Sequence, residues 1–129
     1  MKQKDRTGIY LQVASLGQTL NGHEIPFVTI TAPENDTEEE DENYDNSYSS
    51  IDNDSTGESL SAIQNIPLCD RRVVVLSSRV HPGETNASWI MHGLLDYLTS
   101  QTREAHLLRM NYVFKIIPML NIEGVVHGR

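Results

Sequence analysis

Alternating apolar and polar positions between residues 10 and 31 predict a β-hairpin. Both flanks of this stretch, residues 10–13 and 26–31, are rich in β-branched and aromatic side chains. Their alternation indicates one buried face and one solvated face. Asn21 and Gly22 between them favour a two-residue type I′ turn, because both residues tolerate the positive φ that this turn requires.

The pattern changes at residues 72–78, where the apolar residues are continuous rather than alternating. Such a run is typical of a central strand that is covered on both faces. After it, apolar residues recur with a period of 3.6 and predict an amphipathic helix. These residues are Ala87, Ile90, Met91, Leu94, Leu95 and Leu98. Thr85 or Asn86 can supply the oxygen that caps the first turn of this helix.

The last part of the pattern predicts a short helix over residues 104–110 and a mostly buried strand over residues 112–120, followed by a turn at 121–124. A strand, helix and strand in this order form a βαβ unit, whose crossover is almost always right-handed. The predicted fold class is therefore α/β, a partial mixed sheet in which a β-hairpin joins a largely parallel part. We expect residues 1–129 to belong to one domain.

Charge changes this picture in one segment. The formal net charge is −8, and eleven of the 18 acidic residues lie between residues 33 and 62, where there is no Lys or Arg. The remainder has seven acidic against ten basic residues, a balance of +3. A stretch with so many acidic and so few apolar residues cannot bury enough apolar surface to offset the entropy lost on ordering. We therefore expect residues 33–65 to be a disordered insertion. A functional acidic segment is the alternative, and no nucleic-acid partner is expected.

Cysteine content and hydropathy limit the cellular compartments in which the protein is expected. Cys69 is the only cysteine, which excludes an internal disulfide and a CxxC metal or redox site and fits a reducing compartment. The charged N-terminus is not followed by the apolar segment of a signal peptide. No apolar run approaches the roughly 20 residues needed to cross a bilayer. We therefore expect a soluble, cytoplasmic protein without a membrane partner.

Candidate chemistry lies in the sequence RVHPGE at residues 79–84. In open α/β sheets, sites form in loops at the carboxyl ends of strands, and this loop follows the most apolar run. Imidazole and carboxylate are both good zinc ligands, so His81 and Glu84 are a candidate metal pair if the backbone turns tightly at Pro82 and Gly83. The alternative is a strand-ending turn in which Glu84 interacts favourably with the dipole of the next helix. The spacing alone leaves both open.

Two longer segments carry a resemblance. The sequences SSRVHPGETNASW at residues 77–89 and FKIIPMLN at residues 114–121 resemble the cytosolic carboxypeptidases, a family of zinc metallocarboxypeptidases. QTLNG at residues 18–22 and VTIT at residues 28–31 also match, so the similarity covers nearly all of the chain outside the acidic segment. The resemblance implies the N-terminal portion of a metallocarboxypeptidase catalytic domain.

The resemblance also implies a function. Members remove C-terminal amino acids, and many remove glutamates from tubulin or other acidic protein tails. His81 and Glu84 match the first two ligands of one catalytic Zn²⁺. A third ligand, a general base and the arginines that bind the substrate carboxylate are expected beyond residue 129. A cytosolic, microtubule-associated enzyme is the corresponding expectation.

The match is imperfect near its end. Ile122 and Glu123 stand where the family usually has Pro and Asp, and Arg129 falls just before the position of the first substrate-binding arginine. Among the other histidines, only His127 is expected in a loop at the same sheet edge, and it is not expected to complete the metal site. The alternative hypothesis is a noncatalytic fragment or pseudoenzyme that acts at most as an interaction module. A more distant alternative is an amidohydrolase of the same fold.

Overall fold

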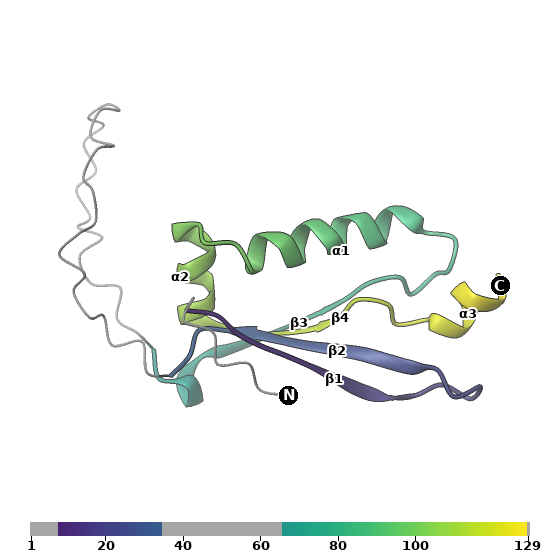
Figure 1. The fold of residues 1–129 in the computed structure, drawn as a ribbon, viewed down its shortest axis with the longest axis horizontal. Helices are drawn as coiled ribbons and strands as arrows, with labels where there is room; N and C mark the ends of the chain where they lie inside the picture. Colours follow the sequence, from purple (N-terminus) through teal and green to yellow (C-terminus); the bar gives the residue numbers. More distant parts are fainter. Residues whose placement is uncertain (1–7, 35–65, 129) are drawn as a thin grey trace, which may run out of the picture.

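The computed structural model describes residues 8–34 and 66–128 (Figure 1). The insertion expected at residues 33–65 lies outside the described residues, apart from Pro33 and Glu34, and so does the N-terminal segment before Gly8. No helix in the described ranges is long and apolar enough to cross a membrane.

Four strands form one mixed sheet. They are β1 (Tyr10–Gln18), β2 (Glu24–Thr31), β3 (Arg72–Ser77) and β4 (Tyr112–Ile117), in the spatial order β1-β2-β4-β3. β2 pairs antiparallel with both β1 and β4, whereas β3 and β4 are parallel. The predicted α/β class with a partial mixed sheet is confirmed, although only one of its three strand pairs is parallel.

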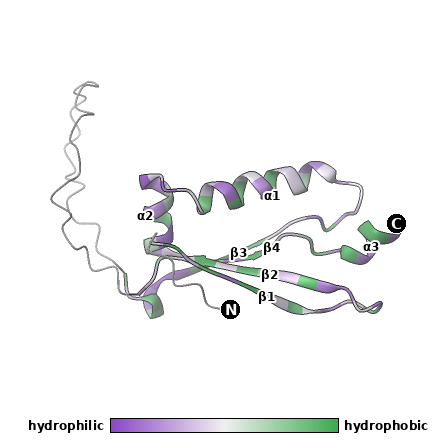
Figure 2. Cartoon of the chain, viewed as in Figure 1, coloured by the Kyte–Doolittle hydropathy of each residue, from purple (hydrophilic) through white to green (hydrophobic). Residues whose placement is uncertain are grey.

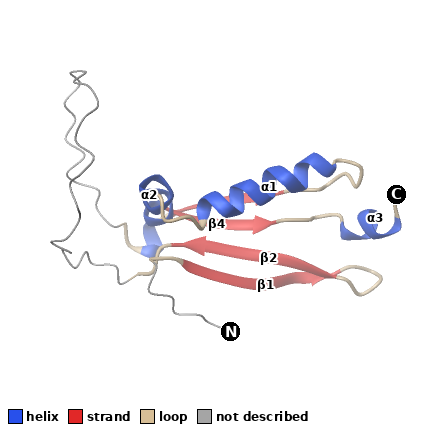
Figure 3. Ribbon diagram, turned by 45° about the horizontal axis from the view of Figure 1, so that its top comes forward, coloured by secondary structure: helices blue, strands red, loops and turns tan. Residues whose placement is uncertain are grey.

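Helices cover one face of this sheet. α1 (Thr85–Leu98) runs along it, α2 (Arg103–Asn111) follows near one end, and α3 (Ile122–His127) comes after β4 at the other end (Figures 1 and 3). A 3-10 turn, η1 (Leu68–Asp70), precedes β3. The core between α1 and the sheet consists of Val28, Ile30, Met91, Leu98, Phe114 and Ile116. The helix predicted from the apolar stripe is thus present, and it packs through Met91, Leu94, Leu95 and Leu98. Ile90 of the predicted stripe is instead 70% exposed.

The opposite face of the sheet is open among the described residues. Val73 and Val75 of β3 are 59% and 66% exposed. Hydrophobic and hydrophilic stretches both occur along the strands of the sheet (Figure 2). The prediction of a strand covered on both faces is therefore wrong for the described part of the chain. β3 lies at the edge of this sheet, and the described helices pack on a single face.

The hairpin connection also differs from the prediction. Five residues rather than two join β1 to β2, and the Thr19 N–H donates to the His23 carbonyl at 2.9 Å. Only Gly22 has a positive φ, +85°, so the type I′ turn is wrong. Asn21 instead donates its backbone N–H and its amide to Glu123 in α3. A contact between distant segments thus overrides the local turn preference.

Two helix starts depart from the expected caps. α1 is capped by Glu84 without a side-chain hydrogen bond, so neither Thr85 nor Asn86 takes the predicted role. The expected turn at residues 121–124 is instead the beginning of α3. The Asn121 side chain accepts a hydrogen bond from the Gly124 N–H at 2.9 Å, which caps this short helix.

A buried arginine ties α2 to the sheet. The Arg109 side chain is fully buried, and its guanidinium donates to the carbonyls of Leu98 and Ser100 at 2.8 and 2.9 Å. Its own carbonyl accepts from the Thr31 hydroxyl and the Ala32 N–H. Removal from water lowers the pKa of Arg109. The junction of α1 and α2 is thereby held against the end of β2.

Gly124 provides a test of how tightly α3 packs. A Cβ on Gly124 would lie 2.3 Å from Cγ of Pro82 and 2.9 Å from the Asn121 side chain. We expect Gly124→Ala to destabilise the fold by about 1–3 kcal/mol through overpacking. Gly93→Ala is the matched control, since Gly93 lies within α1 with nothing within 4 Å of its added Cβ. Gly93→Ala should raise the free energy of unfolding, measured by urea denaturation, by up to about 1 kcal/mol. Equal effects of the two substitutions would contradict the packing of α3 against Pro82.

Candidate metal centre

The two candidate ligands occupy the ends of one tight turn. The Glu84 N–H donates to the His81 carbonyl at 3.2 Å, with Pro82 and Gly83 at the two central positions. Proline is favoured at the first central position of such turns, because its ring fixes φ close to the required value. Gly83 has no positive φ and nothing within 4 Å of an added Cβ. The tight turn at Pro82 and Gly83 is therefore present, and it does not require a positive φ at Gly83.

Arg79 holds this turn in place. It is the only non-glycine residue with a positive φ, +54°, in the described part of the chain. Its Nε donates to the Pro82 carbonyl at 2.9 Å and its Nη1 to the Ser88 hydroxyl at 2.7 Å. One side chain therefore joins the turn to the first turns of α1.

The turn lies beside the segment that follows β4. The Ser78 N–H donates to the Ile117 carbonyl at 3.0 Å, and the Leu120 N–H donates to the Ser78 carbonyl at 2.9 Å. The Asn121 N–H then donates to the Arg79 carbonyl at 3.2 Å. Backbone pairing thus continues past the carboxyl ends of the parallel strands. Together with the hairpin loop, the turn and α3 gather at one end of the molecule (Figure 1).

The side chains of His81 and Glu84 suit a metal. Both are exposed, and neither has a hydrogen bond or ion pair with another residue in the described ranges. An imidazole nitrogen and a carboxylate oxygen at the ends of one turn match the donor types of a catalytic zinc site. They are two donors of the three protein ligands that such a site uses. Their role as zinc ligands stays a prediction.

No described His, Cys, Asp or Glu completes a three-donor group with this pair. His127 lies elsewhere, in the single three-donor group among the described residues, with His23 and Glu123. From the position of His92 between Met91 and Leu94, its side chain is expected at the edge of the packed face of α1. It lies instead on the exposed side of that helix, with Nε2 3.4 Å from a carboxylate oxygen of Asp96.

Similar proteins show the family to which this chain belongs. The chain matches the zinc carboxypeptidase family over residues 3–129. It belongs to that family. It is 44% identical over 121 residues to cytosolic carboxypeptidase 1 of Gallus gallus, covering 93% of this chain and 8% of that protein. It is 40% identical over 121 residues to cytosolic carboxypeptidase 4 of Homo sapiens, covering 93% and 9%. The chain thus spans less than a tenth of these curated relatives.

A solved structure supports the fold. The metallo-carboxypeptidase of Burkholderia cenocepacia superposes with a TM-score of 0.61 at 23% identity, over 92% of this chain and 24% of that one. The resemblance to cytosolic carboxypeptidases and the partial metallocarboxypeptidase sheet are therefore confirmed. The zinc carboxypeptidase family also implies zinc as the metal.

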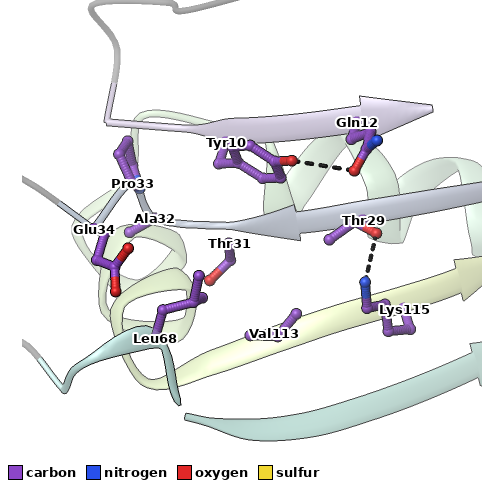
Figure 4. A pocket seen from close by; sticks show the side chains of 10 residues that line it. All are labelled: Tyr10, Gln12, Thr29, Thr31, Ala32, Pro33, Glu34, Leu68, Val113 and Lys115. Atoms are coloured by element: carbon purple, nitrogen blue, oxygen red, sulfur yellow. Dashed lines mark hydrogen bonds between the residues drawn. The ribbon is translucent and has the colours of Figure 1, made fainter. Parts of the chain in front are cut away.

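One hollow in the described part of this carboxypeptidase chain is lined by none of the candidate ligands. It measures about 480 Å³ and lies where β1 begins and β4 begins, on the face away from α1 (Figure 4). Lys115 donates to the Thr29 hydroxyl there at 2.9 Å, and the Tyr10 hydroxyl donates to Gln12. None of its lining residues belongs to a described group of metal donors. It is therefore no part of the candidate metal centre.

Glu123 joins α3 to the hairpin loop. Hydrogen bonding by the Thr19 hydroxyl, with smaller contributions from the side chain and backbone of Asn21, lowers the pKa of Glu123 from 4.5 to about 2. Partial removal from water opposes this shift, and the charge of His23 adds slightly to it. Sequence reasoning missed this junction. The i, i+4 spacing of Glu123 and His127 would have indicated it only if residues 122–127 had been predicted as a helix.

Substitutions of Arg79 test whether its hydrogen bonds hold the turn in place. Arg79→Ala should reduce the free energy of unfolding by about 1–3 kcal/mol, because two hydrogen bonds from a charged group are lost. Arg79→Gly loses the same bonds but relieves the positive φ, so it should be less destabilising by about 1 kcal/mol. Arg103→Ala, at an exposed position in α2, is the control. If all three variants unfold at the same urea concentration, Arg79 does not hold the turn.

Glu123 predicts an acid dependence. Since its folded pKa is below its unfolded value, its contribution to stability is present above pH 4.5 and is lost as the pH falls toward 2. Urea unfolding of Glu123→Gln should therefore vary less between these pH values than unfolding of the unaltered chain. Glu104→Gln, at an exposed site in α2, should leave the pH profile unchanged. Identical profiles for Glu123→Gln and the unaltered chain would refute this role.

Proposed function

We propose that the protein containing this chain is a zinc-dependent carboxypeptidase that uses metal-activated water to remove C-terminal glutamates from acidic protein tails, with tubulin as a candidate substrate. One observation supports this above the others. A hydrogen-bonded turn presents His81 and Glu84 together at the carboxyl edge of the parallel strands, and neither side chain has another partner among the described residues.

The roles of the residues follow from their positions. His81 would supply an imidazole nitrogen and Glu84 a carboxylate oxygen to the metal, while Arg79 fixes the turn between them. Bound zinc would polarise the scissile carbonyl and lower the pKa of its water. We propose that the third protein ligand, the general base and the carboxylate-binding arginine lie beyond residue 129.

The glutamate preference and the location are the finer part of the proposal. Outside residues 33–62 the chain has a balance of +3, which favours acidic substrates weakly. Relatives bear the name cytosolic carboxypeptidase, which supports a cytosolic location. Association with microtubules is proposed only together with tubulin as the candidate substrate. We also propose that residues 1–129 alone are inactive, since only two ligands of the catalytic metal are identified among the described residues. A noncatalytic role as an interaction module is the alternative.

Ligand substitutions test the function. In the intact protein, His81→Ala and Glu84→Ala should each lose one equivalent of zinc and the release of glutamate from a peptide with a C-terminal glutamate chain. His92→Ala is the control, because His92 is an exposed histidine on the neighbouring helix. It should retain both properties. Unchanged zinc content in both ligand variants would refute the metal assignment.

A matched peptide that ends in neutral residues tests the glutamate preference separately from the carboxypeptidase reaction. Equal rates of hydrolysis for the two peptides would support the proposed carboxypeptidase activity and contradict the proposed preference for glutamate. Glutamate release by residues 1–129 alone would reject the proposed inactivity of the isolated chain.

A further inference from the structure

A second set of metal-binding side chains lies at the junction of the hairpin loop and α3. We propose that His23, Glu123 and His127 form a site for a divalent transition metal of the zinc type, separate from the His81–Glu84 turn. One ligand atom from each of the three residues lies within 4.8 Å of the others. This is the only such group in the described residues.

The geometry requires small movements only. Nε2 of His127 is 3.1 Å from Oε2 of Glu123, one helical turn earlier in α3. With metal–ligand bonds of 2.0–2.2 Å, the donors of a tetrahedral site lie about 3.3–3.6 Å apart. The Glu123–His127 pair is thus already near this spacing, and His23 must approach by rotation of its side chain.

Asn21 can supply a fourth donor. Its Nδ2 is 2.6 Å from Oε2 of Glu123 and 3.2 Å from Nε2 of His127, so the amide already lies between two of the proposed ligands. Rotation of the amide by half a turn would place Oδ1 in the same position, and a carbonyl oxygen can bind a metal. The site would then have two imidazoles, one carboxylate and one amide oxygen.

The donor set selects the class of metal. Imidazole nitrogen suits zinc, nickel and cobalt, whereas calcium and magnesium prefer oxygen ligands alone. Glu123 is ionised above its pKa of about 2 and so provides a full negative charge at neutral pH. The side chains of His127 and Glu123 are 46% and 26% exposed, and a cleft of about 480 Å³ beside them gives a path for entry.

Binding here would connect distant parts of the chain. Asn21 and Glu123 are separated by 102 positions in the sequence. A metal would therefore clip the hairpin loop to α3, and α3 contacts Pro82 of the candidate catalytic turn through Gly124. The competing explanation is that the hydrogen bonds of Asn21 hold this junction without a metal, and the experiment separates the two.

Chemical modification of the unaltered, metal-depleted protein tests the site without any substitution. Diethyl pyrocarbonate modifies free imidazole nitrogens of the intact protein, and mass spectrometry follows each of the five histidines in residues 1–129 separately. With zinc chloride at about ten times the dissociation constant, modification of His23 and His127 should slow roughly tenfold. His92 and His106 should react at unchanged rates and serve as internal controls.

The outcomes discriminate between the two sites. If His81 is protected and His23 and His127 are not, the second site is wrong and the proposed catalytic metal stands. If His23 and His127 are protected and His81 is not, the second site stands and the catalytic assignment fails. A double variant, His23→Gln with His127→Gln, should lose one zinc equivalent, whereas a His92→Gln, His106→Gln control should lose none. Unchanged zinc content in the first variant would overturn the proposal.

Discussion

The contact between Gly124 and Pro82 is the constraint on which the functional end of this molecule depends. Parallel pairing of β3 and β4 brings two connections to the same edge of the sheet. The Ser78 N–H donates to the Ile117 carbonyl and the Leu120 N–H to the Ser78 carbonyl, which extends that pairing beyond the strands. A side chain at residue 124 would collide with the proline ring. The absence of a Cβ therefore allows α3 to lie directly against the turn that presents His81 and Glu84.

The same turn is held from its other side by a strained residue. A positive φ disfavours Arg79 by about 1–2 kcal/mol, and two hydrogen bonds from its guanidinium compensate. This backbone conformation directs the chain out of β3 into the turn, and the side chain returns to bind the carbonyl of Pro82. Strained backbone of this kind gathers at sites where geometry matters more than local stability. In this chain it lies two residues before the first candidate ligand.

The sequence predicted the elements well where local periodicity determines them. The stripe of α1, the hairpin strands and the βαβ order all follow from apolar spacing that each segment satisfies by itself. The errors arose where a distant partner decides the outcome. Asn21 bonds to Glu123 instead of forming a type I′ turn, and Asn121 caps a helix where a turn was expected. The exposure of Val73 depends on which helices cover the sheet, and a strand's own residues do not specify that.

The two candidate metal sites also differ in whether local sequence or a distant contact determines them. His81 and Glu84 could be proposed from the sequence because one short turn holds both, and the family resemblance favoured a metal pair over a plain turn. The group of His23, Glu123 and His127 could not, because it exists only after the hairpin loop meets α3. Since α3 contacts both the group and Pro82, the position of this one helix sets the geometry of the two sites together. A change in α3 should therefore alter the candidate catalytic turn even when it leaves His81 and Glu84 intact.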